Sequence, residues 1–570
     1  MLSNALSVVT GSFVYWCSYR KSITLMLSVD KARGKCKFQP IEKKGWISFF
    51  MKGNRFKETL LRNENFSVTW ELVPGRGAKE AAQDKAIALA GQAAAGGRIH
   101  ALTLTDNPGG SPAMSADFMG SEIVRLDIEP LVHLTCKDRN RNAIESQLYA
   151  LARAGIKNLL IMTGDYPVSG YQGRPHPVFD LDPIHVLQLI TEMNRGLEFQ
   201  SIRGMVRQKP FDFFAGAVVS PFKTTEAELI GQYYKLMKKI DAGAQFIVTQ
   251  LGYDARKFHE LLLFLKFNGL KIPLIGNIYI LPYGAAKMMN RNDLPGSVVT
   301  DQLLAEIDRE RTEPDKGEEA RMLRAARMYA ILKGMGYNGV HIGGHNIQYE
   351  QVETIIRQGE DLVSQWPDLL RFFDYPLDRG FYFFEKDPVT GLNRETPTER
   401  QKRPLDSPVP YSYEVSRFFH ALMFEPGKKL YGTSQKFFNK VRKTRLENPL
   451  HKMEHLTKVL LFDCQDCGDC ALIDTAYLCP MSQCPKKQRN GPCGGSFQGW
   501  CEVYPGKRQC IYVRAYARLK NHQEERQLEN NIVPPCNWDL HQTSSWSNYY
   551  SGKDHTSQKQ VTQPAGKPKG

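Results

Sequence analysis

A helix, a glycine and a buried strand follow one another in the same order at three places along the chain. The three strings are ARAGIKNLLIMTG, KKIDAGAQFIVTQ and KGMGYNGVHIGG. The glycine ends each helix because it can adopt the left-handed cap conformation, and the apolar run after it indicates a strand covered on both faces. Repeats of this unit predict a parallel sheet with helices outside it, because parallel strands need crossover connections.

Strands of this kind recur between residues 67 and 360, and eight of them are predicted. Eight strands alternating with helices over this length favour a (β/α)8 TIM barrel, and an open doubly wound α/β sheet is the alternative. No GxGxxG motif opens the first helix after a strand, which argues against a dinucleotide-binding sheet. The predicted strands are Ser67–Pro74, His100–Asp106, Pro130–Cys136, Asn158–Pro167 with its turn, Phe213–Pro221, Phe246–Gln250, Pro273–Ile278 and Gly339–Gly344.

The chain has 570 residues, which is too long for one hydrophobic core and indicates two or three domains. Periodicity weakens after the barrel, where Pro and aromatic residues indicate a packed connector. The last residues are rich in Ser, Gln, Lys and Gly, a composition typical of disorder. The predicted domains are a poorly ordered basic N-terminal extension (1–60), the barrel (61–360), an irregular connector (361–463), a small cysteine-rich metal-binding domain (464–536) and a disordered tail (537–570).

The formal charge of +15 lies at the two ends of the chain. Residues 1–66 hold 12 Lys and Arg against 4 Asp and Glu, and residues 464–570 hold 13 against 9, which leaves about +3 for the middle. The barrel therefore has no basic groove for nucleic acid, and we expect no nucleic-acid partner. Residues 2–16 are too short and too interrupted for a membrane span, so we expect no membrane anchor. The clustered cysteines indicate a reducing compartment, so we expect a cytoplasmic protein.

Eight of the 12 cysteines lie between Cys464 and Cys510, and a ninth is Cys536. Short, repeated spacing such as CxxCxxC predicts metal binding in a reducing compartment rather than a disulfide framework. A CxxCxxC run with a later Cys-Pro is close to the spacing of ferredoxin iron–sulfur sites, and zinc held by four thiolates is the alternative. The candidate ligands are Cys464, Cys467, Cys470, Cys479, Cys484, Cys493, Cys501 and Cys510.

Polar side chains stand at or near the ends of several predicted strands. In SVTWELVP, the apolar residues share one face, which places Glu71 on the barrel interior. Such a carboxylate is suited to proton donation if its pKa is raised, and an ion pair with Arg76 or Arg98 is the structural alternative. Asp165 follows the strand from Asn158, and capping of the next helix is the alternative there.

Three further strand ends carry side chains that suit a bound heterocycle. Gln250 has a planar amide that can make two hydrogen bonds with a pterin or a flavin, whereas Thr105 is a weak signal alone. His133 lies in an apolar strand, where a satisfied core histidine is the alternative. Together with Glu71 and Asp165, these side chains are predicted to converge on one mouth of the barrel, as in an active site.

The residues at these strand ends lie in strings that resemble one enzyme family in order and in position. VTWELVP, IHALTLTDNPGG, PLVHLTCKDRNR, NLLIMTGDYP and KKIDAGAQFIVTQ are similar to the methylenetetrahydrofolate reductase family of flavin-dependent (β/α)8 barrels, from about residue 67 to 350. The resemblance implies an oxidoreductase of one-carbon metabolism, in which NAD(P)H reduces a flavin. The reduced flavin then converts 5,10-methylenetetrahydrofolate to 5-methyltetrahydrofolate, a tetrahydrofolate interconversion.

The resemblance also implies roles for single residues. Glu71 matches the general acid that helps to open the folate ring, and Asp165 matches a carboxylate that contacts the pterin and tunes the flavin. Gln250 matches a folate-binding glutamine. The flavin contacts are matched by Thr105, His133, Gly164 and Lys239.

Two positions depart from the family pattern. Asp106-Asn107-Pro108 stands where many relatives have Tyr-Gly-Ala, and Thr163 replaces an arginine. Both changes fall where the flavin phosphate and ribityl chain are expected, so FAD is predicted with FMN as the alternative.

The cysteine-rich end resembles an extension found on some bacterial reductases. The resemblance implies that electrons enter through an iron–sulfur carrier and an electron-transfer partner, or that zinc makes this end a structural module. We also expect a homo-oligomer. Two other functions stay open: a folate-dependent methyltransferase of a corrinoid pathway, which would bind folate without flavin, and a zinc module whose basic ends bind RNA.

Overall fold

The computed structural model describes residues 53–62, 64–400, 408–442 and 444–559, together with four strands within residues 6–40. The chain divides into two units, Met1–Asn54 and Arg55–Gly570. In the first unit, the four strands pair antiparallel in chain order, where the sequence predicted a poorly ordered segment; the rest of 1–52 lies outside the described residues. The strands are β1 (Leu6–Val9), β2 (Ser12–Cys17), β3 (Leu25–Asp30) and β4 (Lys35–Pro40).

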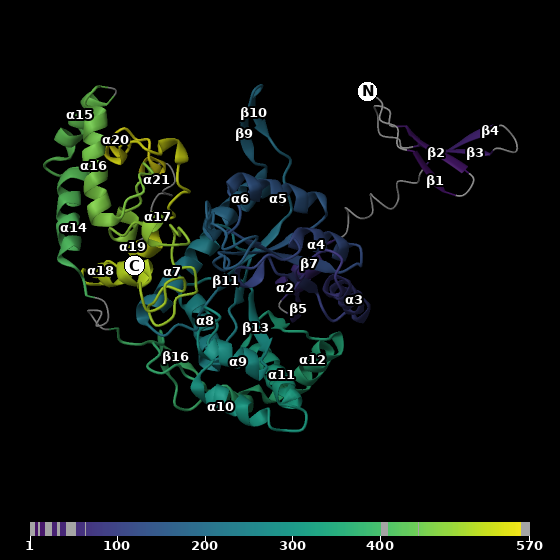
Figure 1. The fold of residues 1–570 in the computed structure, drawn as a ribbon. Coiled ribbons are helices and arrows are strands. Elements are labelled where there is room, and N and C mark those ends of the chain that lie inside the picture. Colours follow the sequence, from purple (N-terminus) through teal and green to yellow (C-terminus); the bar gives the residue numbers. More distant parts are fainter. Residues whose placement is uncertain are drawn as a thin grey trace. The chain divides into compact units, whose positions relative to one another are not determined.

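The second unit is built on a closed barrel of eight parallel strands (Figure 1). The last strand pairs with the first, Gly339 opposite Ser67, which closes the sheet and excludes the open alternative. The predicted (β/α)8 barrel is confirmed, and each predicted strand is present. The strands are β5 (Ser67–Leu72), β6 (Ala101–Leu104), β7 (Glu129–Thr135), β8 (Asn158–Met162), β11 (Phe214–Val219), β12 (Phe246–Thr249), β13 (Leu274–Ile280) and β14 (Gly339–Gly344).

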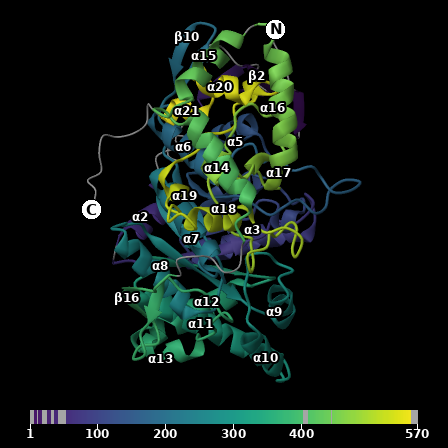
Figure 2. The same ribbon diagram turned by 90° about the vertical axis from the view of Figure 1, so that its left-hand side faces the viewer.

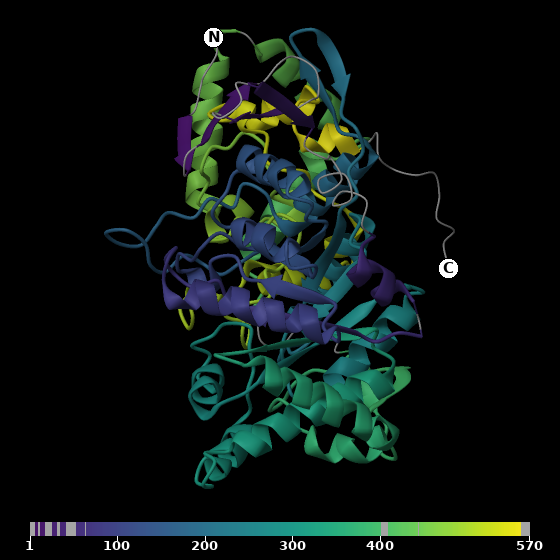
Figure 3. The ribbon, with the colours of Figure 1, turned by 90° about the vertical axis from the view of Figure 1, so that its right-hand side faces the viewer.

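Helices surround the strands because alternate side chains of each strand face outward. In β5, Val68, Trp70 and Leu72 pack into the outer core, whereas Thr69 and Glu71 face the interior. Figure 3 shows the side covered by α3, α4 and α5. The barrel helices are α3 (Ala81–Gly96), α4 (Ala116–Val124), α5 (Arg141–Arg153), α6 (Pro183–Arg195), α7 (Glu226–Asp241), α8 (Ala255–Phe267), α9 (Tyr283–Asn290), α10 (Asp301–Glu310), α11 (Glu318–Met335) and α12 (Tyr349–Leu362).

Two glycines at the repeated junctions have the backbone conformation that the sequence predicts. Gly155 and Gly336 have φ angles of 81° and 98°, in the left-handed region that ends a helix without steric cost. One crossover differs from the others, because the hairpin of β9 (Glu198–Ser201) and β10 (Gly204–Arg207) lies between α6 and β11.

The short helix α2 (Arg55–Leu61) covers the N-terminal end of the barrel. Phe56 and Leu60 are buried among inward-facing side chains at the starts of the strands, and the Phe56 ring lies 5.5 Å from the ring of Phe246. The barrel unit therefore begins at Arg55, earlier than the predicted boundary at residue 61. Because this end is filled by apolar side chains, only the opposite end is left for a polar site.

Much of the connector, predicted to be irregular, is regular secondary structure. Strands β15 (Phe384–Lys386) and β16 (Asn393–Pro397) pair beside α8, where Arg256 Nε donates to Asn393 Oδ1 at 2.7 Å. It begins with η2 (Val363–Gln365), α13 (Trp366–Leu369) and η3 (Leu370–Phe372). Beyond residue 408, α14 (Tyr411–Phe424), α15 (Tyr431–Val441) and α16 (Glu447–Phe462) form a layer outside the cysteine-rich segment (Figures 1 and 2).

The cysteine-rich segment is mostly loop and packs against the barrel through α18 (Ile511–Lys520). Tyr512 and Tyr516 of α18 share a buried cluster with Ile230 and Tyr234 of α7. Its other helices are η4 (Ile473–Thr475), α17 (Pro480–Gln483) and α19 (Gln527–Asn530).

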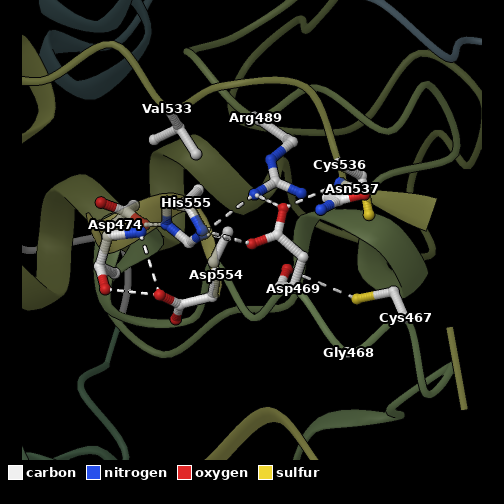
Figure 4. A network of polar contacts seen from close by, with 12 residues as sticks. Cys467, Gly468, Asp469, Asp474, Arg489, Val533, Cys536, Asn537, Asp554 and His555 are labelled. Carbon is white, nitrogen blue, oxygen red and sulfur yellow. Dashed lines mark hydrogen bonds and ion pairs between the residues drawn. The ribbon is translucent and has the colours of Figure 1, made fainter. Parts of the chain in front are cut away.

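The prediction of a disordered tail after residue 536 is wrong as far as residue 559. This segment holds η5 (Trp538–Leu540), α20 (Ser545–Tyr550) and α21 (His555–Lys559), and residues 560–570 lie outside the described residues. His555 is 3% exposed, with Nδ1 at 2.6 Å from Asp469 and Nε2 at 2.9 Å from Asp474 (Figure 4). The tail is ordered because Leu540, Tyr550 and His555 are buried, and the hydroxyl of Tyr550 donates to the carbonyl oxygen of Met423 in α14 at 2.6 Å.

Candidate active site

A cavity of about 300 Å³ lies at the C-terminal ends of the barrel strands. In parallel barrels this end carries the functional loops. The barrel residues predicted as site residues come from different strands and from α7, and all of them line this cavity. They are Glu71, Thr105, His133, Gly164, Asp165, Lys239 and Gln250. The structure thus brings together the polar groups that the sequence placed at strand ends, while their chemical roles remain predictions.

Glu71 lies in this cavity opposite a histidine rather than an arginine. His341 Nε2 of β14 is 3.8 Å from Glu71 Oε2, while Arg98 pairs with Glu353 on the outside. Burial favours the neutral acid, but the nearby imidazole of His341, with a smaller contribution from His133, outweighs burial and lowers the pKa of Glu71. In the absence of substrate, Glu71 is thus an ionised partner of His341, not a carboxyl with a raised pKa.

His341 was not predicted as a site residue, although the sequence carried a signal for it. In the β14 string GVHIGG, Val340 and Ile342 pack into the outer core, so alternation turns His341 inward. Thr69 Oγ1 lies 3.0 Å from His341 Nδ1, which holds the ring in place. A polar residue between outward-facing apolar neighbours was therefore the missed indication.

Several buried polar atoms on the wall of this cavity have no hydrogen-bond partner among the described residues. Leaving such an atom unpaired costs about 1–3 kcal/mol, so in a folded protein it usually has a ligand or a water molecule. The burial also lowers the pKa of His133 to about 4, so that its ring is neutral at pH 7. The unpaired atoms are Thr105 Oγ1, His133 Nε2, Ser220 Oγ, Gln232 Nε2 and Asn277 Oδ1.

Asp165 is exposed and contacts a loop instead of capping a helix. Its Oδ2 accepts a hydrogen bond from the N–H of Gly109 at 2.7 Å, in the loop after β6. Gly164 has a φ of 84°, and a Cβ there would lie 2.8 Å from Thr135, so a side chain would be strained and crowded. The Gly-Asp pair therefore fixes the loop of Gly109 at the rim of the cavity.

Lys239 and Gln250 lie on the α7 and β12 side of the cavity. Lys239 Nζ donates to the carbonyl oxygen of Val218 at 2.5 Å. Burial, with the neighbouring charge of Lys235, lowers the pKa of Lys239 to about 7, so its charge responds to a bound anion. Gln250 Oε1 accepts from the N–H of Leu251 at 2.9 Å.

Asp106, the first residue of the departure after β6, lies on the cavity wall in a structural ion pair. Its Oδ2 accepts hydrogen bonds from Arg139 Nη1 at 2.8 Å and from Thr135 Oγ1 at 2.7 Å. Burial raises its pKa, but Arg139 and Thr135 outweigh burial and lower it. Asp106 therefore anchors the segment after β7 and is not free to act as an acid.

The cysteine-rich segment supplies part of the cavity wall, which the sequence did not predict. Lys486 Nζ donates to the carbonyl oxygen of Gly164 at 2.7 Å and forms an ion pair with Glu502. Gln488 Oε1 accepts from Lys235 Nζ at 2.8 Å and from Thr163 Oγ1 at 3.3 Å. Lys486, Glu502 and residues 493–495 line the cavity, so the site is shared by two segments far apart in sequence.

The predicted metal ligands fall into two groups around two separate small cavities. The first thiol set lies beside α16 and α17, and the second lies between α17 and α18, next to the barrel mouth. Cys493, Lys486 and Glu502 line both the second of these cavities and the barrel cavity. The first thiol set is Cys464, Cys467, Cys470 and Cys479, and the second thiol set is Cys484, Cys493, Cys501 and Cys510.

Comparison with known families decides what this barrel is. The family model described as methylenetetrahydrofolate reductase matches residues 56–358, more than half of the chain. The chain belongs to this family. A second model, described as methylene-tetrahydrofolate reductase C terminal, matches residues 444–539. This match spans α16 and both thiol sets, so the cysteine-rich segment occurs in other members of the methylenetetrahydrofolate reductase family.

The sequence relatives are distant. Methylenetetrahydrofolate reductase 2 of Saccharomyces cerevisiae is 26% identical over 188 residues, which cover 31% of this chain and 28% of that protein. Methylenetetrahydrofolate reductase 2 of Schizosaccharomyces pombe is 26% identical over 260 residues, or 42% of this chain and 37% of that protein. The chain thus spans about a third of the length of these relatives.

Among solved structures, a similar chain is an uncharacterized protein from Clostridium thermocellum that binds two copies of 5-methyl-5,6,7,8-tetrahydrofolic acid. It is 13% identical, covers 54% of this chain and 99% of its own, and has a TM-score of 0.38. Within the described residues, none of the helices has the length and apolar character needed to cross a membrane.

Proposed function

We propose that this protein is a flavin-dependent methylenetetrahydrofolate reductase that reduces 5,10-methylenetetrahydrofolate to 5-methyltetrahydrofolate. The observation that carries the proposal is the convergence of Glu71, Asp165 and Gln250 on one cavity of a barrel of this family. Gln250 would bind the pterin through its amide, and Asp165 would contact the pterin from the rim. The cavity of about 300 Å³ has both polar and apolar lining residues, as a site for a pterin and a flavin requires.

The cavity fits a flavin because it offers buried polar atoms that have no hydrogen-bond partner in the described part of the chain. Thr105 and His133 have unpaired buried polar atoms, and Lys239 is a buried amine whose positive charge an anionic ring would stabilise. These residues, with Gly164, would hold FAD, or FMN in view of the changed loop after β6. When bound, the flavin supplies the hydride chemistry, with NAD(P)H or a one-electron carrier as the reductant.

Glu71 would be the proton donor for opening of the folate ring. Its pKa is lowered in the free protein, where His341 lies beside it, so the carboxyl must gain a proton before it can donate one. A substrate that covers Glu71 removes water and favours its neutral form, in which the carboxyl carries that proton. His341 is a positioning residue in this scheme, because it acts on the substrate only through Glu71.

Each thiol set would hold one iron–sulfur cluster. Within the part of the chain that the structure describes, no group of three or more His, Cys, Asp or Glu side chains is arranged to hold one metal ion. The CxxCxxC spacing of Cys464, Cys467 and Cys470, with the later Cys479-Pro480, favours clusters, which supply one-electron chemistry when bound, over zinc.

The first test is the visible spectrum of protein purified without oxygen, with iron and zinc analysis. We expect flavin bands together with iron–thiolate absorbance that bleaches on reduction. Zinc without iron would contradict the cluster assignment and leave the reductase. Folate binding without flavin would overturn the reductase in favour of the corrinoid methyltransferase.

The second test is the variant Glu71→Gln, with Glu64→Gln on the surface as its matched control. The nicotinamide should still reduce the flavin of Glu71→Gln, while folate reduction falls by about 10²–10⁴-fold, because only the second step needs the proton. Unchanged folate turnover would exclude Glu71 as the acid.

A further inference from the structure

Helices α14, α15 and α16 carry an apolar surface that no other part of the described chain covers. On α16, exposed residues recur every three to four positions: Met453 is 55% exposed, Leu456 61% and Leu460 77%. This spacing places them on one side of the helix. Further exposed apolar side chains of the same layer are Phe418, Phe419, Phe437, Leu446, Val459 and Leu461. Contiguous apolar patches of this kind mark interaction sites.

The surface of α15 and α16 is positively charged. Its exposed ionisable residues between 426 and 462 are all basic, while Glu447 is half-buried and Glu454 is buried. These two acids therefore do little to neutralise the surface. The exposed cations are Lys428, Lys429, Lys436, Lys440, Arg445 and Lys452.

The other side of α16 faces the first thiol set. Glu454, His455, Lys458 and Phe462 line the cavity of that set, and Lys458 Nζ lies 3.8 Å from Cys470 Sγ. An α-helix with its side chains is only about 10–12 Å across. A protein seated on the outer side of α16 would therefore lie one helix width from these thiols.

We propose that the exposed face of α14–α16 is the docking site of a small acidic electron-carrier protein. The basic rim attracts an acidic partner, and the apolar stripe supplies the desolvated centre of an interface. A second copy of this chain is a poor occupant, because an isologous pair would bring the same cations face to face. The inference rests on the proposed function, since it assigns the reductant of the same enzyme.

The chemistry balances with a one-electron donor. Two reduced carriers each give up one electron and leave oxidised, and the two electrons with two protons convert one methylene group to one methyl group. The nitrogen–carbon bond of the folate's five-membered ring breaks, one proton with the two electrons forms the new carbon–hydrogen bond, and the second proton forms an N–H bond on the released nitrogen.

The test measures binding of an acidic ferredoxin to the anaerobically purified protein, by calorimetry at several salt concentrations. The variant Lys436→Glu/Lys440→Glu should weaken binding about tenfold or more and flatten the salt dependence. Its control, Arg203→Glu/Lys271→Glu, makes the same change in charge at exposed sites on the barrel and should bind normally. Leu456→Gln/Leu460→Gln tests the stripe, with Ile202→Gln/Met205→Gln on the β9–β10 hairpin as its control.

Other outcomes would overturn the docking site and leave the reductase standing. Equal ferredoxin affinity in all variants would place the contact elsewhere. A dimer in sedimentation that Leu456→Gln/Leu460→Gln dissociates would assign the face to a second copy. Binding to anionic vesicles that the same variant abolishes would assign it to a lipid surface. Loss of folate reduction with normal ferredoxin binding would instead count against the proposed function alone.

Discussion

Two buried histidines, one in the barrel and one in the C-terminal tail, have pKa values that are shifted in opposite directions. His133 lies in the cavity with Nε2 unpaired among the described residues, and burial lowers its pKa to about 4. His555 is equally buried, but each ring nitrogen meets a carboxylate, Asp469 or Asp474. Burial acts against its charge too, yet these hydrogen bonds outweigh it and raise the pKa of His555.

The difference distinguishes a ligand-binding surface, around His133, from a buried ion-pair network that stabilises the fold, around His555. The polar groups of the barrel mouth are left free for a ligand, at a cost in stability. The His555 ring lies between two carboxylates, which favour its charged form, and Arg489 Nη2 donates to Asp469 at 3.2 Å beside it (Figure 4). We therefore expect changes in the tail to alter stability and changes at His133 to alter ligand binding.

The largest effect should follow from His555→Leu, which leaves Asp469 and Asp474 without their shared partner. Breaking a buried ion pair costs about 3–5 kcal/mol, because a charge remains buried and uncompensated. Urea unfolding at pH 6 would measure the loss. Asn439→Leu, at an exposed site in the same half of the chain, is the control. A decrease in the free energy of unfolding below about 1 kcal/mol would mean that the His555 network does not stabilise the fold.

The pH dependence of stability should run in opposite directions for the two histidines. The folded pKa of His133 is depressed, so its contribution is present above about pH 6.5 and is lost as the pH falls toward 4, by about 3 kcal/mol. The folded pKa of His555 is raised, so its contribution is present below pH 6.5 and is lost as the pH rises through the raised value. Unfolding of His133→Gln and His555→Gln from pH 4 to 8 would separate the two, and parallel curves would contradict the contrast.

An intermediate effect on the free energy of unfolding is expected where the cysteine-rich segment meets the barrel, at the buried pair of Lys486 and Glu502. Lys486→Met removes charged hydrogen bonds worth about 2 kcal/mol and leaves the Glu502 carboxylate without its cation, beside the Cys493 thiol whose Sγ lies 3.9 Å from Oε2. The double variant Lys486→Met/Glu502→Gln should recover most of this stability, because no unpaired charge remains. If Lys486→Met lowers flavin content without lowering the free energy of unfolding, the Lys486–Glu502 pair acts in ligand binding and not in stabilising the fold.

The smallest effect on stability should come from His133→Asn at pH 7. We expect the free energy of unfolding to fall by less than about 1 kcal/mol, because Nε2 of the neutral ring has no hydrogen-bond partner among the described residues that the substitution could remove. Flavin affinity should fall measurably, by fluorescence titration of the apoprotein. His100→Asn is the control, since His100 has a similarly lowered pKa but accepts a hydrogen bond from the N–H of Val68 at 3.1 Å. Unchanged flavin affinity in His133→Asn would remove His133 from the proposed flavin site.

Much of the barrel was predictable because its signals are local. The apolar run after Gly155 and the alternation around Glu71 depend on residues within one element, and both strands formed as predicted. Convergence of Glu71, Thr105 and Gln250 then followed from the barrel geometry alone. His341 follows the same alternation, so its inward orientation could also have been predicted from the sequence.

The tail and the extension were less predictable because their order comes from long-range contacts. A polar composition indicates disorder only if no distant partner pairs its charges, and Asp469 pairs with His555, 86 residues away. The contact of Lys486 with Gly164 is separated by 322 residues and has no local signal.

By itself, the sequence determined the barrel, its family, the polar strand ends and the eight clustered thiols, because periodicity, spacing and residue type are local properties. Tertiary structure alone decided that α2 fills one end of the barrel and that the extension lines the other. It also decided that the thiols form two sets and that Glu71 is paired with His341. The physical reason is that burial and charge pairing depend on which distant side chains share a space, and spacing along the chain does not encode that.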